Sequence, residues 1–322
     1  MENLKRIDVA NGDADGLFAL HQLRLAEGVE GELVTGAKRD VKLLERVRAG
    51  PGDLVTVCDI SLAANRDALL RLLGAGARVR YFDHHHAGDV PDHASLEAHL
   101  DASAGTCTSL LVDRHLGGAQ RAWAVAAAFG DSLDAVAREH AAPLDLPAGG
   151  LESLRELGGL VNYNAYGESV AELLVAPAEL YRLIAPFRDP LECLSGLEIF
   201  KGIASTREAD LENARKVSPR LRLGHCAAYV LPEAAWSRRV IGEFANRLEA
   251  EAPERALAVL APSAHGGFIV SVRAPRGGAR DAGAFCSRFA DGGGRRQAGG
   301  INRLPAAQSA EFLRAFEKFS ER

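Results

Sequence analysis

The sequence has few cysteines, no long apolar run and no excess of basic charge. Its five cysteines lie far apart and form no CxxC pair, which argues against a zinc knuckle and against a disulfide framework. We expect them to be reduced, mostly buried thiols, as in a cytoplasmic protein. No segment is apolar over the ~18 residues that a membrane span requires, and the N-terminal segment has no apolar signal core. We therefore expect a cytoplasmic protein without a membrane partner.

The formal net charge of −5 argues against a protein that coats nucleic acid nonspecifically, because that role needs a broad basic surface. The apolar fraction of 47% and the charged fraction of 25% are those of an ordinary globular protein. A chain of 322 residues is long enough for two domains. We see no internal repeat and no low-complexity tract.

Strand and helix patterns alternate along the first part of the chain. Apolar runs typical of strands lie at residues 5–10, 31–36, 54–61 and 77–83, and helical patterns lie between them at residues 17–28, 41–49 and 63–73. Parallel neighbours need a crossover helix between them, so this alternation predicts βαβ units. We expect a mostly parallel α/β sheet with helices on both faces.

Acids and imidazoles follow three of these strands. The set consists of Asp13, Asp15, Asp59, Asp83, His84 and His85. Ligand sites in open parallel sheets form beyond the carboxyl ends of the strands, so we expect these side chains to share one edge. An Asp followed by histidines can also be a solvated turn, but three separate segments ending in this way favour a site for metal binding or proton transfer.

The middle of the chain is mostly helical. Asp131 follows an apolar helical pattern at residues 120–129, and it is either another site carboxylate or the N-cap of the next helix. A fresh helix is expected to start at Pro177. Pro186–Pro190 breaks the helical pattern and marks a linker, which gives domains at residues 1–187 and 191–322.

The last third has a different order of elements. Strands are expected at residues 225–231, 256–261, 268–272 and 301–304, and helices at residues 233–251, 280–290 and the C-terminus. One further helix is expected before the linker, at residues 103–115. This order predicts a smaller mixed α/β sheet, covered by helices on one side.

A basic and glycine-rich cluster lies between Val272 and Leu304. It contains seven arginines against two aspartates, and three consecutive glycines at 292–294. Glycines let the backbone approach an anion closely, and guanidinium groups match phosphate oxygens bidentately. The alternative is a flexible loop with solvated arginines.

Taken together, these motifs resemble the DHH phosphoesterases. The resemblance is to the two-domain members with a DHH-associated C-terminal domain, namely RecJ-like nucleases and the nanoRNase and cyclic-dinucleotide phosphodiesterases. The matching segments are Asn11–Gly16 (NGDADG), Val57–Asp59, Asp83–His85 (DHH), Gly130–Ser132 (GDS), Val270–Arg273 (VSVR) and Gly292–Gly300 (GGGRRQAGG). They cover nearly the whole chain in the order of the family.

The resemblance implies a centre of two metal ions, usually Mn²⁺ with Mg²⁺ as the other candidate, that activates a water for attack on phosphorus. It implies metal ligation by Asp13, Asp15, Asp59, His84 and Asp131, with Asp59 bridging the ions. It further implies that His85 assists at the phosphate or the leaving oxygen, and that Asp83 orients the imidazoles from behind. The implied substrate-binding residues are Arg273, Gly292, Gly293, Gly294, Arg295 and Arg296.

Two positions depart from the family pattern. Members commonly have histidine where this chain has Asn11 and Arg295. Asn11 offers only a neutral amide oxygen, so it is a weaker candidate ligand and one metal site is expected to be weakened or rearranged. Arg295 keeps a positive charge for a phosphate, but it cannot donate a proton at neutral pH.

We therefore expect a manganese-dependent, exonuclease-like phosphodiesterase that hydrolyses a short oligonucleotide or a linear or cyclic dinucleotide. Two alternatives stay open. One is a non-catalytic nucleotide-binding module on a degenerate DHH scaffold, and the other is a pyrophosphatase or polyphosphatase with the same metal centre. A homodimer also stays open.

Overall fold

The structure is a computed structural model of the chain, and it describes residues 4–321. The chain divides into two compact units, Met1–Ala204 and Ser205–Arg322, which we call the N-terminal and C-terminal units. This division lies within the long helix α9 (Glu198–Arg215), whereas the linker expected around residue 188 is followed directly by the short helix α8 (Pro190–Gly196). Among the described residues, no helix combines the length and the apolar character needed to cross a bilayer.

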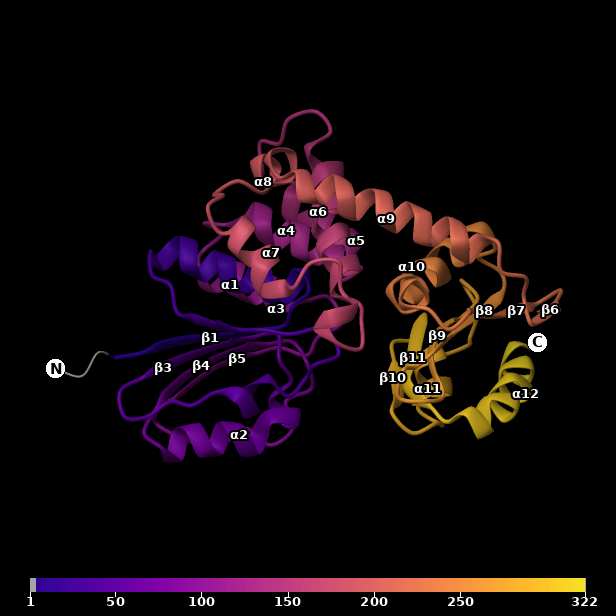
Figure 1. The fold of residues 1–322 in the computed structure, drawn as a ribbon, viewed down its shortest axis with the longest axis horizontal. Coiled ribbons are helices and arrows are strands. Elements are labelled where there is room, and N and C mark those ends of the chain that lie inside the picture. The colour runs from indigo at the N-terminus through magenta and orange to yellow at the C-terminus, as the bar shows by residue number, and fades with distance from the viewer. Residues whose placement is uncertain (1–3, 322) are drawn as a thin grey trace. The chain divides into compact units, whose positions relative to one another are not determined.

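The N-terminal unit is built on a five-stranded sheet in which every strand pair is parallel, as the alternation predicts (Figure 1). The strand order is β2 (Glu32–Val34), β1 (Arg6–Ala10), β3 (Leu54–Cys58), β4 (Arg78–Asp83) and β5 (Leu96–Leu100). The carboxyl ends of the adjacent strands β1, β3 and β4 therefore meet at one edge. The acids and histidines of the sequence motifs follow these three strands.

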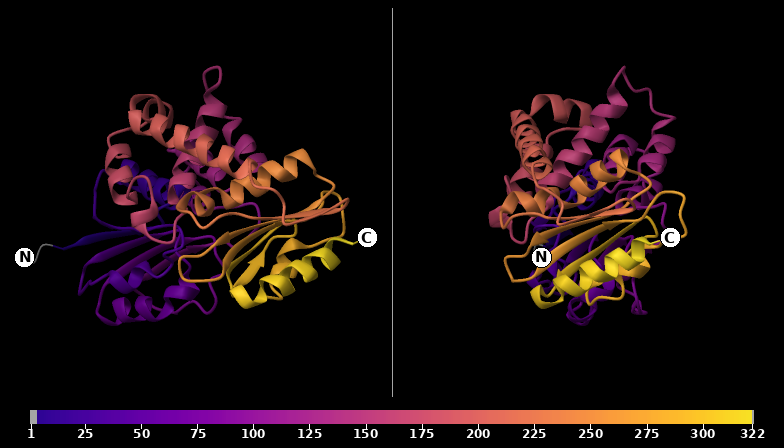
Figure 2. Two further views of the ribbon diagram at one scale, coloured as in Figure 1. Left: turned by 45° about the vertical axis from the view of Figure 1, so that its right-hand side comes forward. Right: turned by 90° about the vertical axis from the view of Figure 1, so that its right-hand side faces the viewer.

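Helices cover both faces of this sheet (Figures 1 and 2). Helix α2 (Leu62–Gly74) packs on one face, where Leu69 and Tyr81 share a buried cluster. Helices α1 (Ala14–Glu27) and α3 (Thr108–His115) pack on the other face, where Leu23 and Val112 share a cluster with Phe82. Tyr81 and Phe82 are successive residues of β4 and point to opposite faces, so both faces of the strand are buried.

The remaining helices of this unit form a layer over α1. They are α4 (Arg121–Gly130), α5 (Asp134–Ala141), α6 (Gly150–Ala165), α7 (Pro177–Ile184) and α8, with α7 starting at the predicted Pro177. Helices α4 and α6 cross at very short range, because a Cβ atom on Gly158 would lie 1.9 Å from the carbonyl oxygen of Ala126. Only glycine fits at this crossing, which fixes the position of the C-terminal end of α4 and hence of Asp131.

The C-terminal unit contains a six-stranded mixed sheet. Its order is β10 (Gly292–Gly294), β11 (Ala298–Leu304), β9 (Phe268–Arg273), β8 (Ala256–Pro262), β7 (Cys226–Val230) and β6 (Leu221–Leu223), and only β7 and β8 pair in parallel. Helices cover both faces, so the expectation of one covered side is wrong (Figure 2). Phe244 of α10 (Ala235–Glu251) packs on Tyr229, and Phe312 of α12 (Ser309–Ser320) belongs to the cluster of Ala228 on the other face.

Several elements differ from the sequence-based expectation. The helix expected at residues 41–49 is a single 3₁₀ turn, η1 (Leu43–Arg46), and the helix expected at residues 280–290 is the short α11 (Ala282–Cys286). The helix expected from residue 103 starts only at Thr108. The strands β5, β6 and β10 were not expected, because β5 and β6 lie in polar segments and β10 is made of glycine alone. All five cysteines are free and buried, which confirms that expectation.

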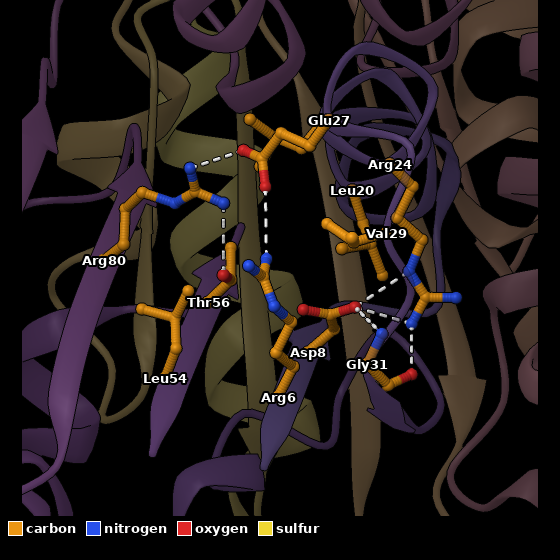
Figure 3. A pocket seen from close by; sticks show the side chains of 11 residues that line it. Arg6, Asp8, Leu20, Arg24, Glu27, Val29, Gly31, Leu54, Thr56 and Arg80 are labelled. Atoms are coloured by element: carbon orange, nitrogen blue, oxygen red, sulfur yellow. Dashed lines mark hydrogen bonds and ion pairs between the residues drawn. The ribbon is translucent and has the colours of Figure 1, made fainter. Parts of the chain in front are cut away.

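A charged network joins the end of α1 to the amino ends of the strands (Figure 3). Arg24 Nη2 lies 2.6 Å from Asp8 Oδ2, and Glu27 pairs with Arg80 at 2.5 Å and with Arg6 at 3.7 Å. These side chains surround a cavity of about 10 Å³, which has room for one water molecule. The acids and arginines pair with one another, so this network holds α1 on the sheet.

His21 of α1 gives the fold a pH dependence. Its Nε2 lies 2.9 Å from the carbonyl oxygen of Phe187 and its Nδ1 lies 3.4 Å from Tyr181 Oη. Burial lowers the pKa of His21 to about 4. His21 is therefore protonated below about pH 6.5 in the unfolded chain but only below about pH 4 in the folded chain. The free energy of unfolding is highest above pH 6.5 and falls as the pH decreases toward 4.

We expect the free energy of unfolding to decrease by about 2 kcal/mol from this residue between pH 7 and pH 5. Urea unfolding of the wild type and of His21→Gln at both pH values measures this contribution. The wild type should lose more stability than the variant on acidification. Equal losses would show that His21 is not the titrating group.

Candidate metal centre

The centre begins where β1 passes into α1. Asp13 is the N-cap of α1, and its Oδ1 accepts a hydrogen bond from the backbone N–H of Gly16 at 3.0 Å. A side chain added to Gly16 would collide with the backbone of Asn11, so this glycine permits the tight turn of the NGDADG motif. The turn buries Asp13 and aims its carboxylate across the carboxyl edge of the sheet.

Asp15, in the first turn of α1, receives the N-terminus of α3. Its Oδ2 and Oδ1 accept hydrogen bonds from the backbone N–H groups of Thr108 and Ser109, each at 2.7 Å. A buried carboxylate takes up two of the unpaired N–H groups that open a helix, which is favourable for the helix dipole. This explains why α3 begins at Thr108 and not at residue 103.

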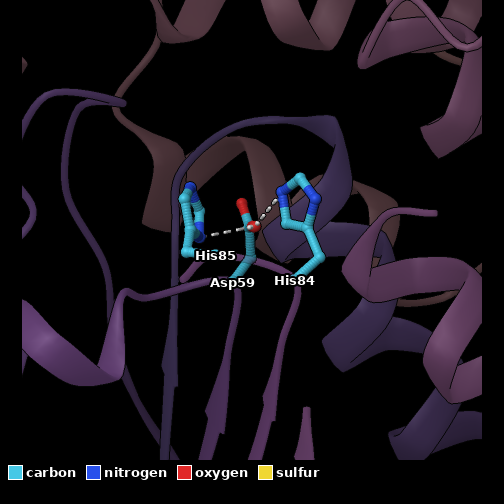
Figure 4. A group of neighbouring side chains, drawn as sticks. All are labelled: Asp59, His84 and His85. Carbon is cyan, nitrogen blue, oxygen red and sulfur yellow. Dashed lines mark ion pairs between the residues drawn. The ribbon is translucent and has the colours of Figure 1, made fainter. Parts of the chain in front are cut away.

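Asp59 stands between two imidazoles at the end of β3 (Figure 4). His84 Nε2 lies 3.4 Å from Asp59 Oδ1, His85 Nδ1 lies 3.9 Å from the same oxygen, and Thr108 Oγ1 donates to it at 3.1 Å. The backbone of Asp59 has a φ of 59°, a left-handed conformation that is uncommon for a non-glycine residue. Such strain persists only where the surroundings fix it, and it is concentrated at functional sites.

Asp83 contacts His85, and its expected role of orienting both imidazoles stays a prediction. His85 Nδ1 lies 2.7 Å from Asp83 Oδ1, and Asp83 Oδ2 accepts from the backbone N–H of Leu62 at 3.3 Å. Asp83 is completely buried, whereas the side chain of His85 is 45% exposed. The imidazole therefore has a fixed Nδ1 and an Nε2 that is accessible to a ligand.

Lys38 is the residue of the centre that the motifs did not reveal. Its Nζ lies 2.5 Å from Asp13 Oδ2 and 3.3 Å from Asn162 Oδ1, and it lies 5.3 Å from the ring centroid of Tyr166. Lys38 comes four residues after β2, so the rule that placed the acids at the carboxyl edge could have placed it there as well. Its ammonium group is a positive charge inside an acidic cluster.

The two remaining candidate ligands lie beside these residues. Asp131 is the C-cap of α4, and its electrostatic neighbours are Lys38, Asp15, His84 and Asp13. Asn11 is buried and uses its amide for the loop: its Oδ1 accepts from the N–H of Asp13 at 3.3 Å and its Nδ2 donates to the carbonyl oxygen of Lys38 at 3.4 Å. Metal ligation by Asn11 stays a prediction.

The electrostatics show a deficit of positive charge in the centre. Burial raises the pKa of Asp59, and the charges of Asp13 and Asp15 raise it further. Burial would lower the pKa of His84, but its interactions with Asp59 and Asp15 raise it to about 10. Burial would also raise the pKa of Asp13, but Lys38 and the hydrogen bond from Gly16 lower it. The carboxylates thus stabilise the protonated forms of His84 and Lys38.

The donor set fits a divalent cation. Carboxylate and imidazole groups suit Mn²⁺ and related ions, whereas no cysteine thiolate contributes among the residues described at this edge. Asp59, His84 and His85 offer ligand atoms that all lie within 4.8 Å of one another. The separation of 3.4 Å between His84 Nε2 and Asp59 Oδ1 suits two ligands of one ion with bonds of about 2.1 Å.

In the C-terminal unit, Arg273 is occupied by internal contacts. It is 8% exposed, and its guanidinium donates to Asn246 Oδ1, to Ser271 Oγ, and to the carbonyl oxygens of Val272 and Gly242. These bonds use at least four of its five N–H groups. Arg273 therefore braces β9 against α10, and its expected contact with substrate stays a prediction.

The glycines at 292–294 form the strand β10 and not a loop. A Cβ on Gly292 would lie 2.0 Å from the carbonyl oxygen of Cys286, and a Cβ on Gly283 would lie 2.3 Å from that of Gly294. These glycines let α11 pack directly on the β10–β11 hairpin, so the alternative is wrong in treating residues 292–294 as a flexible loop. Arg295 and Arg296 are exposed at the turn of this hairpin, where an anion could reach them.

Comparison with known proteins was made by sequence and by structure. No protein-family model and no curated protein matches the sequence. Among solved structures, a DHH-domain protein that is described as a member of a family of ribosomal proteins is similar, with 17% identity, a TM-score of 0.65 and coverage of 98% of this chain and 86% of that chain.

Two further solved structures are similar over the same extent of this chain. RecJ from Thermus thermophilus in complex with Mn²⁺ has 18% identity and a TM-score of 0.65, covering 98% of this chain and 52% of that chain, so this chain spans about half of it. A pGpG-specific phosphodiesterase from Vibrio cholerae has 13% identity and a TM-score of 0.55, covering 98% of both chains. The chain thus has the fold of these DHH-domain and RecJ structures, as the sequence motifs predict.

Proposed function

We propose that the chain is a metal-dependent phosphodiesterase that hydrolyses short oligonucleotides or linear or cyclic dinucleotides. The observation that carries this proposal is the set of buried carboxylates with adjacent imidazoles at the carboxyl edge of the parallel sheet, in which acidic groups outnumber the cationic ones. Support for the ion comes from solved RecJ structures, which contain Mn²⁺ or Mg²⁺. We propose Mn²⁺ as the preferred ion, with Mg²⁺ as the second candidate.

The ligands that we propose for the ion are Asp59 and His84, with Asp15 and Asp131 next to them. A divalent ion bound there would polarise the phosphoryl oxygen and lower the pKa of its water. Thr108 donates to Asp59 Oδ1 and so fixes the direction of that carboxylate. The rigid strand ends and buried hydrogen bonds provide a centre that needs little reorganisation during the reaction.

His85 is proposed to act on the leaving oxygen. Its Nδ1 lies 2.7 Å from Asp83 Oδ1, which fixes the orientation of the ring, and its side chain is 45% exposed. An imidazolium can donate the Nε2 proton to the oxygen that departs from phosphorus. The Asp83 carboxylate would stabilise the charged ring and keep its orientation during this transfer.

Arg295 and Arg296 are proposed to bind a phosphate of the substrate. We expect the double variant Arg295→Ala/Arg296→Ala to raise KM about tenfold or more and to lower kcat less than about threefold, since guanidinium–phosphate contacts are made in the ground state and kept. Steady-state kinetics with a linear dinucleotide measure this split. Arg303→Ala, which removes one exposed arginine on β11, is the control for loss of a surface guanidinium away from the turn and should change neither constant. A loss confined to kcat would contradict the binding role.

The substrate class is tested with a panel of purified compounds. Wild-type protein with Mn²⁺ would be incubated with linear dinucleotides, cyclic dinucleotides, five-residue oligonucleotides, long single-stranded DNA, pyrophosphate and polyphosphate. We expect the highest kcat/KM for the dinucleotides and short oligonucleotides. Preference for pyrophosphate or polyphosphate would replace this proposal with the phosphatase alternative, and nucleotide binding without turnover would favour the non-catalytic module.

A further inference from the structure

Lys38 lies where the centre would need a second cation. We propose that its ammonium group takes the place of one divalent ion, so that the chain binds a single ion, at Asp59 and His84, and Lys38 supplies the other positive charge. This inference rests on the proposed metal-dependent function and changes the number of ions that the centre requires.

The first argument is that a cation, Lys38, already occupies one oxygen of the Asp13 carboxylate. Asp13 Oδ1 accepts from the N–H of Gly16 at 3.0 Å, and Oδ2 lies 2.5 Å from Lys38 Nζ. Asp13 is 2% exposed, so water cannot replace either partner. An ion bound to Oδ2 would have to displace the ammonium group or stay within a few ångströms of it, and repulsion of +1 and +2 charges at that distance is severe in a buried site.

The second argument is that the backbone delivers this lysine to the site. The N–H of Lys38 donates to the carbonyl oxygen of Ala165 at 3.0 Å, and the carbonyl oxygen of Lys38 accepts from Asn11 Nδ2 at 3.4 Å. Its neighbour Ala37 is 2% exposed. Lys38 is therefore anchored on both sides of its Cα, unlike a surface lysine that turns toward the nearest acid.

Asn11 contacts both Asp13 and the backbone of Lys38. Its position precedes Asp13 in the motif, where it could offer one neutral oxygen to an ion. In the structure that oxygen accepts from the N–H of Asp13, and the amide nitrogen holds the backbone of Lys38. The residue that is the weakest ligand of the set thus positions the lysine that replaces the ion.

The third argument concerns the place of the remaining ion. Among residues 4–321, Asp59, His84 and His85 form one of the groups whose ligand atoms lie within 4.8 Å of each other, and Asp13 is not in that group. Lys38 pairs with Asp13, whereas the ion would bind to Asp59, and Asp131 has electrostatic contact with Lys38 and His84. A single ion can polarise the phosphoryl group, while a lysine ammonium neutralises developing charge on it from the other side.

The number of bound ions tests this inference without any assay of turnover. Metal-free protein would be dialysed to equilibrium against Mn²⁺, the bound metal counted by elemental analysis, and the affinity measured by calorimetric titration. The variants are Asp13→Asn, Lys38→Met and Lys38→Arg. Lys42→Met, which removes an exposed lysine from the same segment, is the matched control.

We expect one ion per chain in the wild type, in Lys38→Arg and in Lys42→Met. Asp13→Asn should also bind one ion, with a Kd raised by about tenfold or less, because Asp13 is not its ligand but its charge acts on Asp59. Lys38→Met should bind two, because it frees Asp13 Oδ2. Two ions in the wild type, a large loss of affinity in Asp13→Asn, or a folded Lys38→Met with one ion would each overturn the inference.

The wild type and Asp13→Asn decide the matter if Lys38→Met does not fold. The outcomes also separate this inference from the proposed function. A wild type that hydrolyses dinucleotides with two bound ions would refute the role of Lys38 and leave the phosphodiesterase proposal intact. A wild type that binds no ion would refute both.

Discussion

Replacing Asp59 with asparagine should lower kcat/KM for a dinucleotide at least about 1000-fold, because the Asp59 carboxylate and His84 are the proposed ligands of the ion. The same change should raise the free energy of unfolding by about 1 kcal/mol. Burial and the charges of Asp13 and Asp15 raise the pKa of Asp59, so the folded chain bears the cost of ionising it in the absence of metal. Asparagine has the same shape and tolerates the left-handed backbone at this position.

Asp8→Asn is the matched control for this prediction. Asp8 is also a buried carboxylate on the parallel sheet, but its partners are Arg24 and the N–H of Gly31. Its removal should lower stability and leave kcat/KM within about threefold of the wild type. Urea unfolding and steady-state kinetics of both variants measure the contrast. An active Asp59→Asn would show that the carboxylate is not required for turnover, and one destabilised as much as Asp8→Asn would show that Asp59 stabilises the fold.

Replacing Asp15 with alanine should reduce the free energy of unfolding by about 3 kcal/mol. The carboxylate accepts two hydrogen bonds of 2.7 Å from the N-terminus of α3, and both N–H groups would be left buried without a partner. The change also removes a negative charge next to Asp59, but this gain is smaller than the loss of two charge-assisted hydrogen bonds. Urea unfolding in the presence of a chelator measures the structural part of the effect.

Asp53→Ala serves as the comparison. Asp53 also accepts hydrogen bonds from two backbone N–H groups, those of Lys5 and Gly50, but it does so at the protein surface. Water can replace the carboxylate there, so the change in stability should be much smaller than for Asp15→Ala. If the two variants lose stability equally, burial at Asp15 does not have the effect that we ascribe to it.

Much of the fold could be predicted from the sequence because the N-terminal sheet follows local rules. Apolar runs separated by helical patterns specify parallel strands, and parallel strands place their carboxyl ends together. This was sufficient to bring Asp59 and His84 to one edge from the sequence alone. The DHH motifs added the order in which these residues follow one another.

The parts that could not be predicted depend on contacts between distant segments. The start of α3 is set by Asp15, 93 residues earlier, and not by a capping residue in its own sequence. The glycines at 292–294 are required by the packing of α11, which composition alone cannot distinguish from a flexible loop. Lys38 lies outside the six matching segments, and its contact with Asp13, at 2.5 Å from Nζ, is visible only in the structure.

These differences have a common physical cause. The apolar pattern along the chain indicates which residues are buried and whether the segment is a helix or a strand. The partners of a polar side chain come from other segments, which this pattern does not identify. Asn11 illustrates this point, because its neutral amide suggests only a weaker ligand in the sequence. In the structure it is a connector that holds the backbone of Lys38 beside Asp13.

The central claim is that this edge of the sheet is a metal centre for phosphodiester hydrolysis. The most direct measurement is the rate of hydrolysis of a linear dinucleotide by one preparation of the wild type, before chelation, after removal of divalent ions, and after addition of Mn²⁺. We predict turnover that is abolished by the chelator and restored by Mn²⁺ in the wild type but not in Asp59→Asn. Turnover that persists without divalent ions, or that Asp59→Asn retains, would contradict the account.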